Sequence, residues 1–207
     1  VVLKSSGIKT IADLRGKKVA VGGQGMGTAL LSERLFKEMG MWDKIRVSYL
    51  GGNDSTQALK DGHIDAFIWS PEIPGPTTVD ISSVKSIVLL DIVSEAQKVR
   101  FFEKYPYYAI GEIPANTYKG VDYAVAVILS SANWIVHKET SPELVYEMAK
   151  VAYSDEGVKY LSSTYKPLKE MGNKKVVLSG IHIPLHPGAE RYWKEIGLMM
   201  PETGRAK

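Results

Sequence analysis

The chain has 207 residues, of which 44% are hydrophobic and 24% charged, a composition typical of folded globular domains. Lysine and arginine number 26 against 23 aspartates and glutamates, a balance too even for a nucleic-acid-binding protein. The absence of cysteine excludes disulfides, thiolate metal sites and cysteine nucleophiles, and no apolar run approaches the roughly 20 residues that span a membrane.

Helix and strand patterns alternate over residues 13–104, which indicates parallel strands joined by crossover helices. The first and last expected strands are rich in Val, Ile and Leu, as is typical of strands covered on both faces. The four strands are expected at residues 18–21, 45–50, 65–69 and 87–90. The first half of the chain is therefore predicted to be one α/β unit.

A glycine-rich loop follows the first expected strand. Gly22-Gly23-Gln24-Gly25-Met26-Gly27 and Thr28 lead into a helical pattern that ends at Gly40. The first N–H groups of a helix lack an acceptor within it and the helix dipole is positive there, so this loop predicts a carboxylate or phosphate site. The spacing fits neither a dinucleotide fingerprint nor a P-loop, and the alternative that the glycines only permit a tight turn stays open.

A second helix is expected over residues 55–60, with Gly62 after it, and Trp69 and Ser70 come at the end of the strand that follows. Ligands of open α/β sheets lie outside the carboxyl ends of the strands. This rule places residues 25–28, 51–55 and 69–71 along one rim.

The second half of the chain changes character. Residues 95–104 are expected to be helical, the tract Tyr105-Pro106-Tyr107-Tyr108 breaks that helix, and residues 123–136 form a long extended apolar stretch.

Two further helices are expected near the end of the chain. One starts at Thr140 in a capping box or at Ser141 with Pro142 in its first position, and its predicted buried stripe is Leu144, Met148 and Val151. The other begins at His186-Pro187-Gly188, with Ala189, Tyr192, Trp193 and Ile196 on one side and Gly197 after the last turn.

Ordered motifs carry a resemblance to a known family. They are Asp13-Leu14-Arg15-Gly16-Lys17-Lys18-Val19-Ala20-Val21-Gly22, then Gly25-x-Gly27-Thr28, Ala58-Leu59-Lys60-Asp61-Gly62-His63-Ile64-Asp65-Ala66-Phe67, Ile113-Pro114-Ala115-Asn116-Thr117-Tyr118-Lys119-Gly120 and Pro184-Leu185-His186-Pro187-Gly188-Ala189. In this order they resemble the solute receptors of TRAP transporters, TAXI family. The resemblance implies an α/β fold like that of type II periplasmic binding proteins, with two lobes joined by a hinge. It also implies a periplasmic or otherwise extracytoplasmic protein that delivers its solute to TRAP membrane permease subunits.

By the same resemblance, residues 14–106 form a complete second lobe, whereas 1–13 and 107–207 form the hinge and only the C-terminal part of the first lobe. The hinge segments are expected near residues 12–15 and 107–114. The resemblance further implies that the signal peptide and the family's first-lobe start are absent from these 207 residues, and strands missing from that lobe are expected to expose apolar surface unless another segment or a second copy covers it.

The implied ligand is a small carboxylate, such as glutamate, another amino acid or a dicarboxylate. Met26 stands where the family usually has a serine, and Trp69 either stacks on the solute or packs within the lobe. The candidate ligand-binding residues are Gln24, Gly25, Met26, Gly27, Thr28, Asn53, Ser55, Trp69, Ser70, Pro76 and Thr77.

We expect no catalytic residue and no cofactor, because no histidine stands beside a serine in a recognisable motif. A bilobal enzyme or the effector-sensing domain of a transcription regulator remain the alternatives. We also expect no metal site, because Pro184 breaks any helix that would align His182 with His186. Asn53-Asp54-Ser55 matches a glycosylation sequon, but a helix cap is the favoured interpretation.

Overall fold

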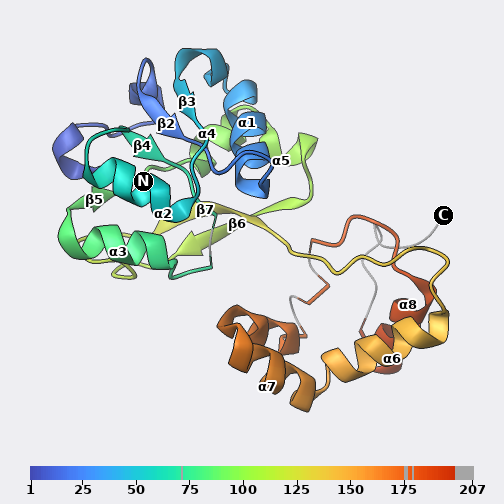
Figure 1. The fold of residues 1–207 in the computed structure, drawn as a ribbon. Helices are drawn as coiled ribbons and strands as arrows, with labels where there is room; N and C mark the ends of the chain where they lie inside the picture. The colour runs from blue at the N-terminus through green and yellow to red at the C-terminus, as the bar shows by residue number, and fades with distance from the viewer. Residues whose placement is uncertain (71, 175–176, 179, 199–207) are drawn as a thin grey trace. The chain divides into compact units, whose positions relative to one another are not determined.

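The computed structural model describes residues 1–70, 72–174, 177–178 and 180–198 (Figure 1). The chain divides into two compact units. Unit 1 comprises Val1–Tyr105 and Ala109–Leu129, and unit 2 comprises Pro106–Tyr108 and Ser130–Lys207. The chain passes between the units at residues 105–109 and 129–130, whereas the hinge segment expected at residues 12–15 lies inside unit 1.

Unit 1 is built on a five-stranded sheet with the order β3-β2-β4-β1-β5. Its strands are β1 (Val2–Leu3), β2 (Lys18–Ala20), β3 (Arg46–Ser48), β4 (Ala66–Phe67) and β5 (Ile87–Val88). β2 is parallel to β3 and β4, as the alternating pattern predicted. β1, which no sequence pattern marked, lies between β4 and β5 and is antiparallel to both, so the sheet is mixed.

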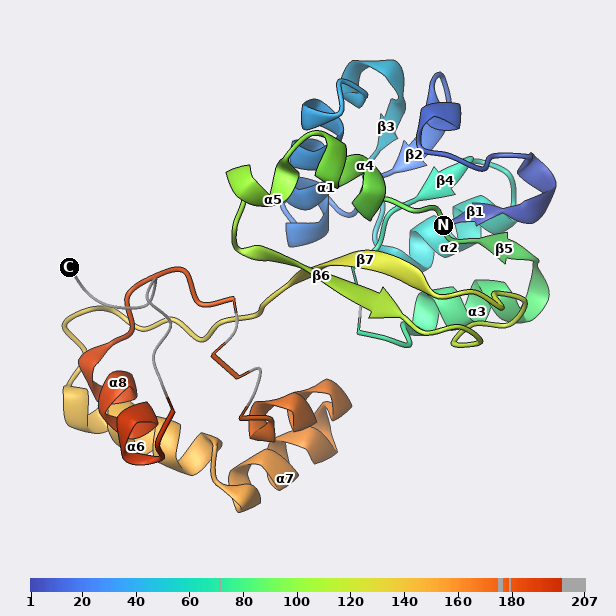
Figure 2. The same ribbon diagram turned by 180° about the vertical axis from the view of Figure 1, so that it is seen from behind.

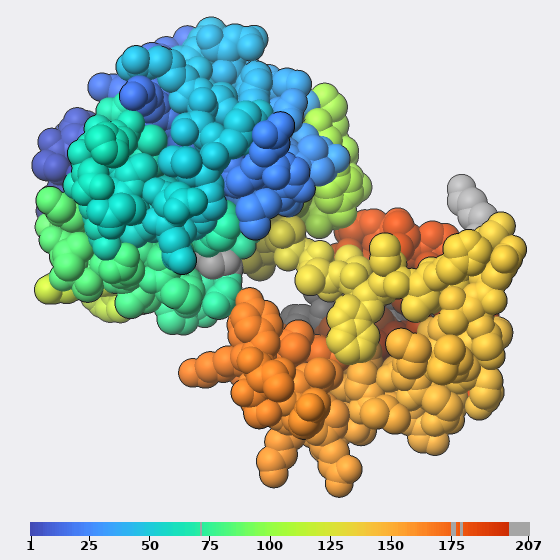
Figure 3. Space-filling view, in the orientation of Figure 1, coloured from blue at the N-terminus to red at the C-terminus, as the bar shows by residue number. Residues whose placement is uncertain are grey.

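Helices cover both faces of this sheet (Figures 1 and 2). They are α1 (Gly27–Glu38), α2 (Gly52–Lys60), α3 (Pro76–Val84), α4 (Val93–Lys98) and α5 (Phe101–Lys104), together with the short 3-10 helices Lys4–Ser6, Ala12–Leu14 and Trp42–Lys44. Side chains alternate along β2: Val19 packs in one cluster with Phe36 of α1, and Ala20 in the other with Leu59 of α2 and Ile81 of α3. α1 therefore lies on one face and α2 with α3 on the other, where they cover the strands in the space-filling view (Figure 3).

Some of the helix ends predicted from the sequence are confirmed and others are not. Gly40 and Gly62 follow α1 and α2 with positive φ, as expected of glycines that end helices. The helix expected over residues 95–104 is two helices, because Arg100 adopts the left-handed conformation (φ +55°) and interrupts it. α3 was not predicted.

Unit 1 also contains a two-stranded sheet, β6 (Tyr108–Ile113) with β7 (Val125–Ser130), of which only the end residues Tyr108 and Ser130 belong to unit 2. The segment between them supplies Tyr118 and Val121 to the same buried cluster as Phe67 of β4. The extended stretch expected over residues 123–136 is strand only in β7, and residues 131–136 are exposed and without regular structure.

The described part of unit 2 is helical: α6 (Pro142–Ala152), α7 (Asp155–Thr164), the 3-10 helix Lys166–Gly172 and α8 (Pro187–Glu195). Of the two starts left open for α6, the structure has the second, because the Ser141 hydroxyl accepts the Leu144 N–H and Pro142 is the first helical residue. α8 begins as predicted, with the His186 Nδ1 accepting the Gly188 N–H at 3.3 Å. Gly188 is required there, because a Cβ would lie 2.1 Å from the Pro142 carbonyl oxygen of α6.

The predicted buried stripe of α6 is wrong. Leu144, Met148 and Val151 are 54%, 46% and 65% exposed. The buried side chains of α6 are Val145, Tyr146 and Ala149, and the last two pack in one cluster with Tyr192 and Trp193 of α8. The helix carries two neighbouring apolar rows, and the aromatic rings of α8 select the row that begins one residue later, about 100° around the helix.

Candidate functional site

The candidate site lies at the carboxyl edge of the unit 1 sheet. β3, β2 and β4 are parallel neighbours, so the segments that follow them, residues 49–51, 21–26 and 68–70, emerge at the same edge. The rim expected from the sequence is therefore present, apart from Pro71, which lies outside the described residues. From β2 the chain passes through α1 to β3 on one side, and then through α2 back across to β4 on the other. This reversal next to β2 is where open α/β sheets bind ligands.

The loop before α1 depends on its glycines. Gly22 has a φ of +98°, and a Cβ there would lie 2.8 Å from the Thr28 Cβ. Gly25 has a φ of +79°, and the Met26 N–H donates to the Gly23 carbonyl at 3.0 Å. The tight-turn role that the sequence left open is thus real, and it delivers the chain to the first turn of α1.

The first turn of α1 presents free amide groups. Met26 is the N-cap, with extended backbone and no side-chain hydrogen bond, and the helical ladder starts with the Leu30 N–H donating to the Met26 carbonyl at 3.2 Å. In the described part of the chain, the amides of Gly27, Thr28 and Ala29 have no acceptor. Unpaired donors at the positive end of a helix are the groups that bind an anion in other helices, and here Thr28 and Ala29 are buried, whereas Gly27 is exposed.

The side chains around these amides are neutral. Residues 21–32 contain no charged side chain, so the amides and the helix dipole are the positive groups of this segment. Thr28 is 9% exposed and packs its methyl group toward Gly22. Met26 is 47% exposed and lies over Gly23, and Gln24 and Gly25 are exposed.

A second uncapped helix starts at the next loop. Gly51 is the N-cap of α2 without a side-chain hydrogen bond, and the Ser55 N–H makes the first helical bond to the Gly51 carbonyl at 2.8 Å. The cap expected from Asn53-Asp54-Ser55 is wrong, because α2 begins at Gly52 and these residues lie inside it. Asn53 is exposed, whereas Ser55 is fully buried and its hydroxyl donates to the Leu50 carbonyl at 3.2 Å.

The segment after β4 carries the remaining candidates. Trp69 is half-buried against Gly52, where a Cβ would lie 2.6 Å from the Trp69 Cε2. Ser70 is exposed and Pro76 is exposed at the first position of α3. Thr77 is 7% exposed, and its hydroxyl oxygen has no partner among the described residues. The structure thus brings Trp69 to the entrance of α2.

One residue that supports the site, Tyr118, was not predicted from the sequence. Tyr118 is buried, and its hydroxyl oxygen accepts the N–H of Gly75, the N-cap of α3, at 2.9 Å. Because 43 residues separate the pair, no local spacing could have indicated it. Tyr118 thereby holds the N-cap of α3, directly before Pro76 and Thr77.

The structure describes no metal centre. No group of three His, Asp or Glu side chains in the described ranges could hold a metal ion. The His182 ring lies edge-on to Tyr107, 6.2 Å between centroids, whereas His186 caps α8, so the two imidazoles serve different contacts. Within the same ranges, no helix has the length and apolar character needed to cross a membrane.

Comparison with known proteins assigns the family. The profile of the NMT1-like family matches residues 1–197. The chain belongs to the NMT1-like family. This NMT1-like protein is similar to the periplasmic aliphatic sulphonate binding protein SsuA from Escherichia coli, with 25% sequence identity and a TM-score of 0.37. The alignment covers 51% of this chain and 40% of SsuA, so the chain spans less than half of that protein's length.

Proposed function

We propose that this NMT1-like protein is an extracytoplasmic solute-binding protein that captures a small carboxylate solute without converting it. The observation that carries the proposal is the set of free amides of Gly27, Thr28 and Ala29 at the carboxyl edge of the sheet, beside the point where the strand order reverses. Membership of the NMT1-like family and the similarity to a periplasmic binding protein support it.

In this proposal the solute carboxylate accepts hydrogen bonds from these amides and from the Thr28 hydroxyl. Bonds to an ionised acceptor are about twice as strong as neutral ones, and here the donors are already aligned by α1. Asp54 lies in the first turn of α2, whereas the first turn of α1 has no acidic residue, which favours α1 for the anion.

The apolar part of the solute would contact Met26 and Trp69. The set of contacts is completed by the exposed or unpartnered groups nearby: Gln24, Gly25, Asn53, Ser70, Pro76 and Thr77. Ser55 would act indirectly, by holding the Leu50 carbonyl at the start of the loop before α2.

The ordered motifs that resemble TAXI receptors support a finer proposal. The recipient of the solute would be the membrane permease subunits of a TRAP transporter, and the solute would be glutamate, another amino acid or a dicarboxylate. The second lobe proposed from the sequence, residues 14–106, contains every candidate ligand-binding residue.

Calorimetric titration and thermal unfolding of the purified chain test the proposal with glutamate, succinate and an alkyl sulphonate. Solute at a hundredfold excess over its Kd should add about 2.7 kcal/mol to the free energy of unfolding. Stabilisation by carboxylates, with the solute recovered unchanged, supports the receptor. Stabilisation by the sulphonate alone would overturn the carboxylate assignment, and conversion of the solute would favour the enzyme alternative.

A variant separates loss of binding from loss of folding. Met26→Asp places a carboxylate at the N-cap, where it can accept the free amides of the first turn and repel an anionic solute. If α1 holds the solute, this variant unfolds no earlier than the parent protein but binds no carboxylate. Unchanged binding would remove α1 from the site.

A further inference from the structure

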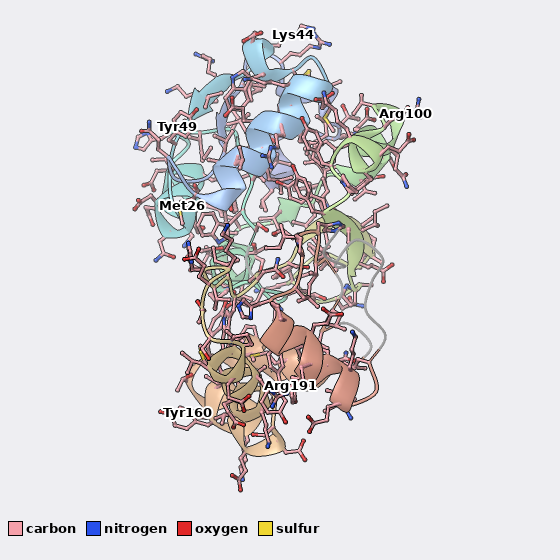
Figure 4. All side chains as sticks on the ribbon, turned by 90° about the vertical axis from the view of Figure 1, so that its right-hand side faces the viewer. Met26, Lys44, Tyr49, Arg100, Tyr160 and Arg191 are labelled. Carbon is pink, nitrogen blue, oxygen red and sulfur yellow. The ribbon has the colours of Figure 1, made fainter. Side chains whose placement is uncertain are left out.

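The edge of the unit 1 sheet opposite the candidate site carries a group of basic side chains, here called the basic edge. Its members are Lys4, Lys9, Arg15, Lys17, Lys18, Lys44 and Arg46. All are exposed except Lys17, which is half-buried. Figure 4 shows Lys44 at the end of unit 1 away from Met26.

Backbone pairing brings these residues together. Lys18 of β2 lies opposite Arg46 of β3 in the parallel ladder. The Arg46 N–H donates to the Lys17 carbonyl at 2.7 Å, and the Gly16 N–H donates to the Lys44 carbonyl at 2.6 Å. Segments 15–18 and 44–46 are therefore side by side.

The antiparallel β1 adds the remaining cations. Because β1 runs opposite to β4, its carboxyl end reaches the edge where the parallel strands begin. Lys4 follows β1 directly, and Lys9 lies in the connection from β1 to β2. The connection starts and ends at this edge, which places Lys4 at its start and Arg15, Lys17 and Lys18 at its end on the same edge as Lys44 and Arg46.

Carboxylates offset only part of the positive charge of the basic edge. Within the described residues, none of its seven cations forms an ion pair. The acidic residues nearby are Asp13, Asp43 and Asp65. The Asp13 carboxylate accepts the N–H groups of Lys9 and Thr10 at 3.0 and 2.9 Å, and that of Asp65 accepts the Lys18 N–H at 2.8 Å. The Asp13 and Asp65 carboxylates therefore bind backbone amides.

The basic edge has no exposed aromatic side chain among residues 1–48, and its apolar neighbour is Val84, which is 63% exposed and lies two residues before Ser86, whose carbonyl accepts the Lys4 N–H. Among residues 1–48, the exposed large apolar side chains are Met26 and Leu30, and both belong to the start of α1 at the opposite edge. Protein interfaces depend on a desolvated apolar and aromatic centre, whereas a polybasic surface binds the diffuse negative charge of acidic lipid headgroups without one. We propose that the basic edge docks this protein on anionic membrane surfaces, a property independent of the solute site.

Vesicle flotation of the full chain tests this docking. Vesicles made of phosphatidylglycerol and phosphatidylcholine in equal parts serve as the anionic surface, and phosphatidylcholine alone is the neutral control. The protein should float with the anionic vesicles only, and raising the salt from about 0.05 M to about 0.5 M should release it, because the Debye length shortens.

Two matched variants locate the binding surface. Lys4→Gln with Lys18→Gln and Lys44→Gln removes three exposed charges from the basic edge, and Lys138→Gln with Lys159→Gln and Lys166→Gln removes three exposed charges from unit 2. The first should weaken vesicle binding by at least about tenfold and the second by less than about twofold. Thermal unfolding of both should match the parent, since none of these side chains makes an ion pair.

Three results would overturn the proposal. Equal weakening by the two variants would assign binding to net charge and not to the basic edge. Equal binding to neutral vesicles, or none to anionic ones, would exclude a lipid surface. Retention on an immobilised polyglutamate peptide without vesicle binding would assign the basic edge to an acidic protein partner.

Discussion

The Trp69 indole lies against the α-carbon of Gly52, so close that a Cβ at residue 52 would come within 2.6 Å of Trp69 Cε2. This contact joins the end of β4 to the entrance of α2 and fixes the position of the aromatic ring at the candidate site. Glycine at position 52 is therefore a requirement of the site, although Gly52 does not have the positive φ that usually explains a glycine.

Gly52→Ala should displace the Trp69 ring and lower the free energy of unfolding by about 1–3 kcal/mol, the usual cost of overpacking. Urea unfolding measures the loss, and near-ultraviolet circular dichroism reports the ring. Gly27→Ala is the control, because nothing lies within 4 Å of a Cβ there; its stability should be unchanged or higher by up to about 1 kcal/mol. Equal behaviour of the two variants would contradict the contact.

Met26→Asp should stabilise α1 by about 1 kcal/mol, because the N-cap then carries a side-chain acceptor for an uncapped first turn. Met26→Leu, which keeps an apolar N-cap, serves as the control and should leave stability within about 0.5 kcal/mol. Urea unfolding at neutral pH compares the two. A destabilised Met26→Asp would show that the amides of the first turn are not available to an acceptor.

Tyr118→Phe should lower stability by about 1–3 kcal/mol, because the buried Gly75 N–H then loses its acceptor. Tyr123 offers a matched comparison: its hydroxyl accepts the Leu89 N–H at 3.2 Å, but the side chain is 41% exposed, so water can replace it. Tyr123→Phe should cost less than about 1 kcal/mol. Denaturant unfolding of both variants ranks them, and the reverse order would argue against the role of Tyr118.

Val145→Ala and Val151→Ala test which face of α6 is buried. Val145 is 6% exposed, and its truncation should cost about 2 kcal/mol, whereas Val151 is 65% exposed and its truncation should change stability by less than about 0.5 kcal/mol. Thermal unfolding measures both. A larger loss of stability in Val151→Ala would support the buried face that was predicted from the sequence.

The hydrogen bonds from the Ser94 hydroxyl and amide hold the pKa of Asp91 below its ordinary value of 3.8. When folding lowers the pKa of a carboxyl group, that group stabilises the folded state at every pH above its pKa in the unfolded chain. This contribution is lost as the pH falls through the pKa of the folded state. Stability should therefore decline below about pH 4, and less steeply in Asp91→Asn. The midpoints of urea unfolding, measured between about pH 6 and about pH 2, compare the parent protein with Asp91→Asn. The same pH dependence in both would show that Asp91 does not contribute.

Local patterns in the sequence determined much of unit 1. Alternating strand and helix patterns located four strands of its sheet, and Gly40 and Gly62 marked helix ends, because left-handed backbone is nearly free of steric cost only in glycine. The loop before α1 was recognisable for the same reason, and the alternation of strand and helix fixed the parallel pairing of β2 with its neighbours.

Contacts between distant segments decided the rest. Nothing near Val2 shows that β1 inserts between β4 and β5, because the partners lie more than 60 residues away along the chain. The choice between two apolar rows on α6 depended on Tyr192 and Trp193, and the acceptor for Gly75 came from Tyr118. Residue order specifies backbone conformation and periodicity, whereas the partner that a buried face or a buried N–H meets is fixed only when the segments pack together.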